Sequence, residues 1–131
     1  MKKQLILLAF SFVLFSCHKD DNNNNNADIS QGTWRVTLFT DSGNDETSDF
    51  TGYEFTFANS GVLSAIRGAI TTNGTWSRGS KFNIDLGVKS DSNKPLGELT
   101  DDWKILSISS NEIKLGDDNA SSGESLTFTK N

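Results

Sequence analysis

Short runs of alternating apolar and polar residues, separated by turn-forming residues, continue from residue 32 to the end of the chain. A period of two is typical of antiparallel strands that bury one face. The runs predict eight strands, at 32–40, 53–57, 62–67, around Trp76, at 81–86, from Trp103 onward, at 113–115, and over the last residues from Leu126. No amphipathic helical pattern interrupts them.

Eight strands joined in sequence, with no helix to cover an open sheet, favour closure, because a closed sheet has no exposed edges. We therefore expect an all-β fold, a small eight-stranded antiparallel up-and-down barrel. A β-sandwich uses the same alternation and remains the alternative.

The alternation also predicts which side chains face inward. In the first strand Leu38 should lie inside with Trp34, while Phe39 should point outward. The inward positions that could line a cavity are Val36, Leu38, Phe55, Phe57, Trp76, Phe82, Ile84, Trp103 and Phe128. In an eight-stranded barrel such residues either surround one small ligand or simply fill the interior.

Two strands have apolar residues on both faces, so their register stays open. The run 62–67 is one of them. In the other, Trp103 and Ile105 share one face and Leu106 and Ile108 the opposite face, so either both faces are covered or a β-bulge shifts the register.

Turn signals separate the strands. Residues 59–61 and 73–74 combine Asn with Gly, which tolerate the positive φ of hairpin turns. In the longer loop 87–101, the spacing of Leu96 and Leu99 predicts a short helical turn.

The N-terminus reads as a signal peptide over residues 1–16. Lys2 and Lys3 precede an apolar run, 5–15, that is shorter than the roughly 20 residues of a membrane span. The following Leu-Phe-Ser-Cys, ending at Cys17, resembles a bacterial lipobox and predicts lipidation of Cys17. Several acyl chains on one cysteine would anchor the chain stably in a membrane.

Residues 17–27 predict a linker, because five consecutive asparagines and their charged neighbours cannot form a packed core. The barrel domain should then occupy residues 28–131. Residues 19–21, Lys-Asp-Asp, resemble the export signal of outer-membrane lipoproteins in Bacteroidota. We therefore expect an outer-membrane lipoprotein that faces the cell surface, although the periplasmic orientation stays open.

Charge and residue types narrow the function. Without Lys2 and Lys3 the chain carries 10 basic and 17 acidic side chains, a formal charge of −7, which disfavours nucleic acid as a partner. The only histidine is His18 in the linker and the only cysteine is Cys17, so we expect no catalytic site, no metal and no cofactor. The oxygen-rich loop 117–124 departs from the spacing of a calcium-binding EF-hand.

The order of the motifs resembles the lipocalin-like lipoprotein domains of Bacteroidota. It starts with Gly-Thr-Trp at 32–34, continues through Gly-Thr-Trp-Ser at 74–77 and Trp-Lys-Ile at 103–105, and ends with Leu-Thr-Phe at 126–128. The resemblance implies an up-and-down barrel that takes small apolar ligands. Lipocalins often stack an arginine over the first tryptophan, whereas here Lys130 occupies that region.

Two binding functions follow. In the first, the barrel holds a small apolar ligand. In the second, the barrel is filled, and the loops 41–49, 87–102 and 116–124 bind a protein or a glycan, because loops on a rigid scaffold commonly carry recognition. In both, the lipid anchor makes the membrane a further partner.

Overall fold

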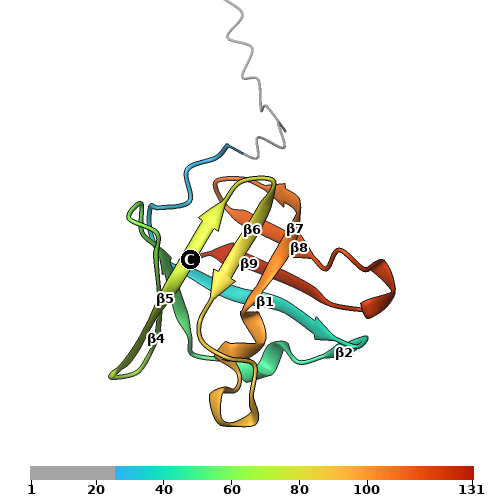
Figure 1. Ribbon diagram of the computed structural model, residues 1–131. Helices are drawn as coiled ribbons and strands as arrows, with labels where there is room; N and C mark the ends of the chain where they lie inside the picture. The colour runs from blue at the N-terminus through green and yellow to red at the C-terminus, as the bar shows by residue number, and fades with distance from the viewer. Residues whose placement is uncertain (1–25) are drawn as a thin grey trace, which may run out of the picture.

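The computed structural model describes residues 26–131, whose strands form one antiparallel sheet that closes on itself (Figure 1). Neighbours follow the order β2-β1-β3-β4-β5-β6-β7-β8-β9, and β1 also pairs with β9. The strands are β1 (Trp34–Asp41), β2 (Asn44–Asp45), β3 (Glu54–Phe57), β4 (Val62–Arg67), β5 (Ile70–Arg78), β6 (Lys81–Asp85), β7 (Asp101–Ile108), β8 (Glu112–Gly116) and β9 (Ser125–Lys130). The two-residue β2 pairs only with the end of β1. The other eight strands form the predicted up-and-down barrel, and the β-sandwich alternative is wrong.

Four short 3₁₀ turns lie in the connections: η1 (Thr47–Phe50), η2 (Asp91–Asn93), η3 (Leu96–Leu99) and η4 (Ala120–Ser122). The helical turn predicted from Leu96 and Leu99 is η3, and both leucines are buried. None of the helical turns in residues 26–131 has the length and apolar character needed to cross a membrane.

A β-bulge in β1 corrects the predicted faces of this strand. The pairing with β9 shifts between Val36 and Leu38. One extra residue in a strand reverses the alternation beyond it. Leu38 is therefore 36% exposed, whereas Phe39 is only 2% exposed and points into the core. The expectations that Leu38 lies inside and Phe39 outside are both wrong.

A second bulge settles the register of β7. The pairing with β8 shifts between Ile105 and Ser107, so Leu106 is 55% exposed while Ile108 is buried. The bulge considered from the sequence is confirmed. In β4, Leu63 and Ala65 take the inner face.

The turn between β4 and β5 differs from the prediction. The chain reverses at Gly68 and Ala69, with a positive φ of 60° at Gly68. Asn73 and Gly74 lie inside β5. Gly74 is there because β6 passes close by: a Cβ at this position would lie 2.0 Å from the backbone oxygen of Asp85.

Aromatic rings occupy the centre of the barrel. The Phe57 ring lies in edge-to-face contact with four others, at centroid distances of 6.2 Å to Trp34, 5.5 Å to Trp76, 5.7 Å to Phe82 and 5.3 Å to Phe128. Of these five side chains, all but Trp76 are fully buried. Edge-to-face packing at these distances is favourable beyond the area that it buries.

The segment before β1 packs against one end of the barrel. Ile29 is buried, and its carbonyl accepts a hydrogen bond of 3.0 Å from the indole nitrogen of Trp34. Arg78 donates to the carbonyl of Ala27 at 2.8 Å. Lys130 places its Nζ 5.8 Å from the centroid of the Trp34 ring, in the role that the resemblance gives to an arginine.

The two ends of the barrel differ in the length of their connections. Alternate connections of an up-and-down barrel lie at the same end, so the short hairpins after β3, β5 and β7 share the end where the chain enters at Ala27 (Figure 1). The connections 42–53, 86–100 and 117–124 lie at the other end, which also carries the short hairpin between β4 and β5. We call these three connections, together with Asp41, the long-loop end.

Candidate functional site

The structure places the predicted lining residues as follows. Val36, Phe55, Phe57, Phe82, Ile84, Trp103 and Phe128 are buried, Trp76 is partly buried, and Leu38 lies outside. The buried residues contact one another and belong to one hydrophobic cluster. Cys17 and His18 lie outside the described residues.

Three hollows in the described part of the chain open to the solvent. The first, of about 440 Å³, lies over β5, β6 and the start of β7. The second, of about 380 Å³, lies where β1 and β3 separate after their single pair, Trp34 with Phe55. The third, of about 460 Å³, lies beside Arg67 and Lys94. The first is lined by the predicted lining residues Trp76 and Ile84 and by polar groups of Thr75, Ser77, Asn83, Asp85, Thr100, Asp101 and Asp102.

The long-loop end is built by contacts between its connections. Gly43 donates a backbone hydrogen bond of 3.2 Å to the carbonyl of Gly123, which also accepts one of 2.9 Å from Thr40 Oγ1. The backbone nitrogen of Glu46 donates to the Phe39 carbonyl at 2.9 Å. These bonds hold the connections 42–53 and 117–124 together at the end of β1.

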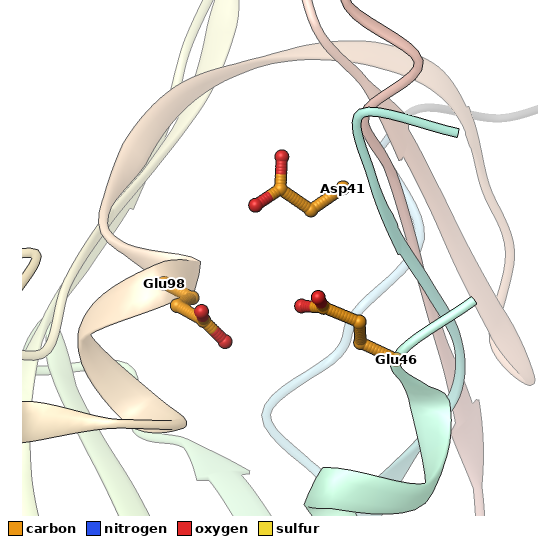
Figure 2. Close-up of side chains that lie close together, drawn as sticks. All are labelled: Asp41, Glu46 and Glu98. Atoms are coloured by element: carbon orange, nitrogen blue, oxygen red, sulfur yellow. The ribbon is translucent and has the colours of Figure 1, made fainter. Parts of the chain in front are cut away.

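Three carboxyl groups from different elements converge at this end (Figure 2). Asp41 ends β1, Glu46 directly precedes η1, and Glu98 lies in η3. One oxygen of each lies within 4.8 Å of the others, and all three residues are half-buried. We call these three residues the carboxyl cluster.

Like charges dominate around the carboxyl cluster. Burial and the nearby charges of Glu98, Asp41 and Asp49 raise the pKa of Glu46, while Lys94 opposes this shift. Lys94 lies 3.4 Å from Glu98 Oε1 and 3.5 Å from Asp91. No donor among residues 26–131 reaches the buried Glu98 Oε2. Lys94 already supplies positive charge beside these carboxyl groups. The short spacing of their oxygens therefore does not by itself indicate a metal ion.

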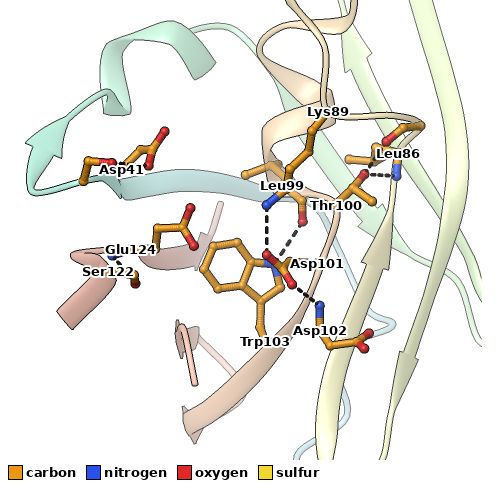
Figure 3. A network of polar contacts seen from close by, with 12 residues as sticks. Asp41, Leu86, Lys89, Leu99, Thr100, Asp101, Asp102, Trp103, Ser122 and Glu124 are labelled. Carbon is orange, nitrogen blue, oxygen red and sulfur yellow. Dashed lines mark hydrogen bonds and ion pairs between the residues drawn. The ribbon is translucent and has the colours of Figure 1, made fainter. Parts of the chain in front are cut away.

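A second polar network joins the connection 86–100 to β7 and reaches toward Glu124 (Figure 3). Lys89 forms an ion pair of 2.8 Å with Asp101, whose other oxygen accepts a hydrogen bond from the backbone nitrogen of Asp102. Burial raises the pKa of Glu124; the charges of Asp117, Asp41 and Asp101 act in the same direction, and Lys89 opposes them. The charge of Asp41 therefore contributes to the raised pKa of both Glu46 and Glu124.

The oxygen-rich loop 117–124 uses its polar groups in contacts within the loop and with neighbouring elements. Asn119 Oδ1 accepts hydrogen bonds from the backbone nitrogen and the hydroxyl of Ser121, and Asp118 forms an ion pair with Lys81. Gly123 has a φ of 67° and lies against Gly43. These contacts account for the conformation of the loop.

A solved structure has a similar fold. It is a crystal structure of a DUF4847 family protein from Bacteroides vulgatus, with 18% sequence identity and a TM-score of 0.55, and the match covers 79% of this chain and 94% of that protein. The two chains share a barrel fold. No protein-family model and no curated protein matches this chain. At 18% identity, the likeness to the DUF4847 protein shows the fold alone.

The carboxyl cluster was not predicted from the sequence. Asp45 and Glu46 are neighbours in a polar loop, a position typical of solvated charges, and Glu98 lies far from them along the chain. Only the closure of the barrel brings η3 beside the end of β1. No local motif signals this approach.

Proposed function

We propose that this chain is a membrane-tethered, lipocalin-like lipoprotein whose barrel is filled, and that it binds a protein partner through the long-loop end. One observation favours loop-mediated binding over the other function expected from the sequence, the binding of a small apolar ligand inside the barrel. The side chains that would line a ligand cavity contact one another instead, with Phe57 at the centre of four aromatic rings.

A small apolar ligand would have to displace these rings. Pockets for such ligands typically have volumes of about 300 to 1,000 Å³ and bury most of the ligand's surface. The hollows of that size among the described residues open outward, and their linings combine surface side chains with the core residues Ile84, Val36 and Phe50. Filling the interior with side chains gives the scaffold rigidity, which suits loops that carry recognition.

Charge at the long-loop end favours a basic partner surface. Its three connections and Asp41 hold nine acidic residues and two lysines. Charges of one sign on a surface steer oppositely charged partners and suppress the wrong ones. Val88, which is 73% exposed, adds an apolar contact among these acids. A basic protein surface with an apolar centre fits this end better than a neutral glycan does.

The tether belongs to the same proposal. Lipidation of Cys17 and export to the outer membrane would hold the chain by its N-terminus. The described chain enters the barrel at Ala27, at the end opposite the long loops. A tether at that end would direct the loops away from the membrane that anchors it.

Site-specific photocrosslinking on whole cells tests the partner site. A photoreactive amino acid at Val88 is expected to give one defined protein adduct, which weakens when Asp91 and Asp117 are changed to Asn. The same amino acid at Ser110, in the hairpin at the opposite end, is the control and should give no such adduct. Equal adducts from both positions, or none from Val88, would overturn the proposed site.

A fluorescent fatty-acid analogue tests the alternative function. The filled barrel should show no saturable binding of this probe. Saturable binding of one probe per chain, lost on replacement of Phe57 by a larger Trp, would restore the carrier function and overturn the filled-barrel proposal.

A further inference from the structure

The carboxyl cluster joins two of the three connections of the long-loop end. Asp41 and Glu46 belong to the segment that leaves β1, and Glu98 to η3 in the connection 86–100. Their side chains point toward one another across the space between these segments (Figure 2). When all three groups are ionised, repulsion acts directly on the contact between the two connections.

The carboxyl cluster contains a buried oxygen that no hydrogen-bond donor in the described part of the chain reaches, and a proton on a neighbouring carboxyl group would supply one. Glu98 Oε2 is buried and, within residues 26–131, has no hydrogen-bond donor. One oxygen of Glu46 lies within 4.8 Å of one of Glu98, so the O–H of a protonated Glu46 can donate to this acceptor once the two side chains move closer. An unsatisfied buried acceptor is costly, and the cost is removed when a donor arrives.

We propose that Asp41, Glu46 and Glu98 form a pH-dependent clasp, in which a proton on Glu46 holds the long loops together and its loss loosens them. The clasp regulates the surface to which the proposed function assigns binding. Its own operation requires no partner.

The surroundings of Glu46 set the direction of the response. Asp41 at the end of β1, Asp49 in η1 and Glu98 in η3 all disfavour the ionised form, and Lys94 before η3 favours it. Arg67 at the end of β4 lines the same outer hollow as Asp49 and Lys94. The balance leaves the pKa of Glu46 above its ordinary value.

A carboxyl group with a higher pKa in the folded chain than in the unfolded chain binds more protons when folded. The closed arrangement is then favoured below the ordinary range of a glutamic acid and loses stability as the pH rises through the raised pKa. Glu124 shifts in the same direction, with Asp41, Asp101, Asp117 and Lys89 around it, so it reinforces the effect. Acidification should close the long-loop end, and neutral pH should loosen it.

Hydrogen exchange at pH 4 and pH 7.5, corrected for the intrinsic exchange rates, measures this opening. We expect segments 42–50 and 86–100 to be several-fold more protected at pH 4 than at pH 7.5, while the β3–β4 hairpin at the opposite end of the barrel shows no difference. Glu46→Gln, which keeps a donor and cannot ionise, should be protected at both pH values. Glu112→Gln, beside the hairpin at the other end of the barrel, is the matched control and should behave as the wild type.

Equal protection of the wild-type loops at both pH values would overturn the clasp, as would a Glu46→Gln variant that keeps the wild-type pH dependence. If Glu46→Gln does not fold, Asp41→Asn provides the second test, because it removes one of the repelling charges and should reduce the pH dependence. The assay contains no partner, so its failure leaves the proposed binding untouched. Conversely, absence of a Val88 adduct would overturn the binding site and leave the clasp standing.

Discussion

Gly74 shows how closely two strands of the barrel wall approach each other. Its Cα faces the backbone of β6, where an added Cβ would lie 2.0 Å from the Asp85 oxygen and 2.9 Å from Leu86 Cδ2. Real Cβ atoms do not approach a backbone oxygen so closely, and a paired strand cannot move aside cheaply. Glycine is thus required here for space, whereas at Gly68 it serves a positive φ in a turn.

Gly74→Ala should lower the free energy of unfolding by about 1 to 3 kcal/mol, because overpacking forces the backbone of β5 away from β6. Gly79→Ala is the matched control, since nothing lies within 4 Å of a Cβ at that position. Urea denaturation of both variants measures the difference. Equal midpoints for the two variants would show that β6 yields to the added methyl group.

At the scale of single elements, the bulge in β1 decides what faces the core. Beyond Val36 the strand reverses its faces, so Phe39 joins Phe50 in an edge-to-face contact with a centroid distance of 5.2 Å. This contact fixes η1 against the end of β1 and so positions Glu46, which directly precedes η1. The bulge therefore contributes to the geometry of the carboxyl cluster.

Phe39→Ala should destabilise the chain by about 3 to 5 kcal/mol, as the deletion of a fully buried aromatic side chain does. Leu38→Ala should cost about 1 kcal/mol or less, because that side chain lies outside the core and is 36% exposed. Thermal unfolding of the two variants checks this order. The reverse order would mean that the strand continues without a bulge, as its sequence pattern suggests.

Sequence alternation predicted the elements well and their irregularities poorly. Alternation over β3, β6 and β9 marks one apolar face, because the extra residues of the two bulges lie in β1 and β7 and not in these strands. The bulge at Leu38 was missed, since Trp34, Val36 and Leu38 alternate perfectly and only the pairing with β9 reveals the extra residue. Asn73 and Gly74 carried a local turn signal, yet the close passage of β6 explains the glycine. The carboxyl cluster depends on contacts between distant segments, which a local pattern does not encode.

At the scale of the whole molecule, the unequal ends of the barrel give it a direction. The chain enters beside the short hairpins, where Trp34, Ile29 and Lys130 pack together, and the long connections extend from the opposite end (Figure 1). A filled barrel between these ends acts as a rigid spacer. A molecule attached through its N-terminus would present the acidic loops outward, which is the geometry of a displayed binding surface.

The unequal ends of the barrel orient the acidic loops only if the N-terminus is attached to a membrane. The lipid anchor at Cys17 is therefore the prediction on which the proposed arrangement depends. Wild-type protein should incorporate labelled palmitate and sediment with membranes, because several acyl chains on one residue give stable attachment. Cys17→Ala should incorporate no label and should be found in the soluble fraction or as the uncleaved precursor. His18→Ala, at the neighbouring position, controls for disturbance of the cleavage region and should remain membrane-bound. If Cys17→Ala still sediments at the wild-type level in a cleaved form, the attachment is not through this cysteine, and the long-loop end would have to reach its partner from a molecule held in some other way.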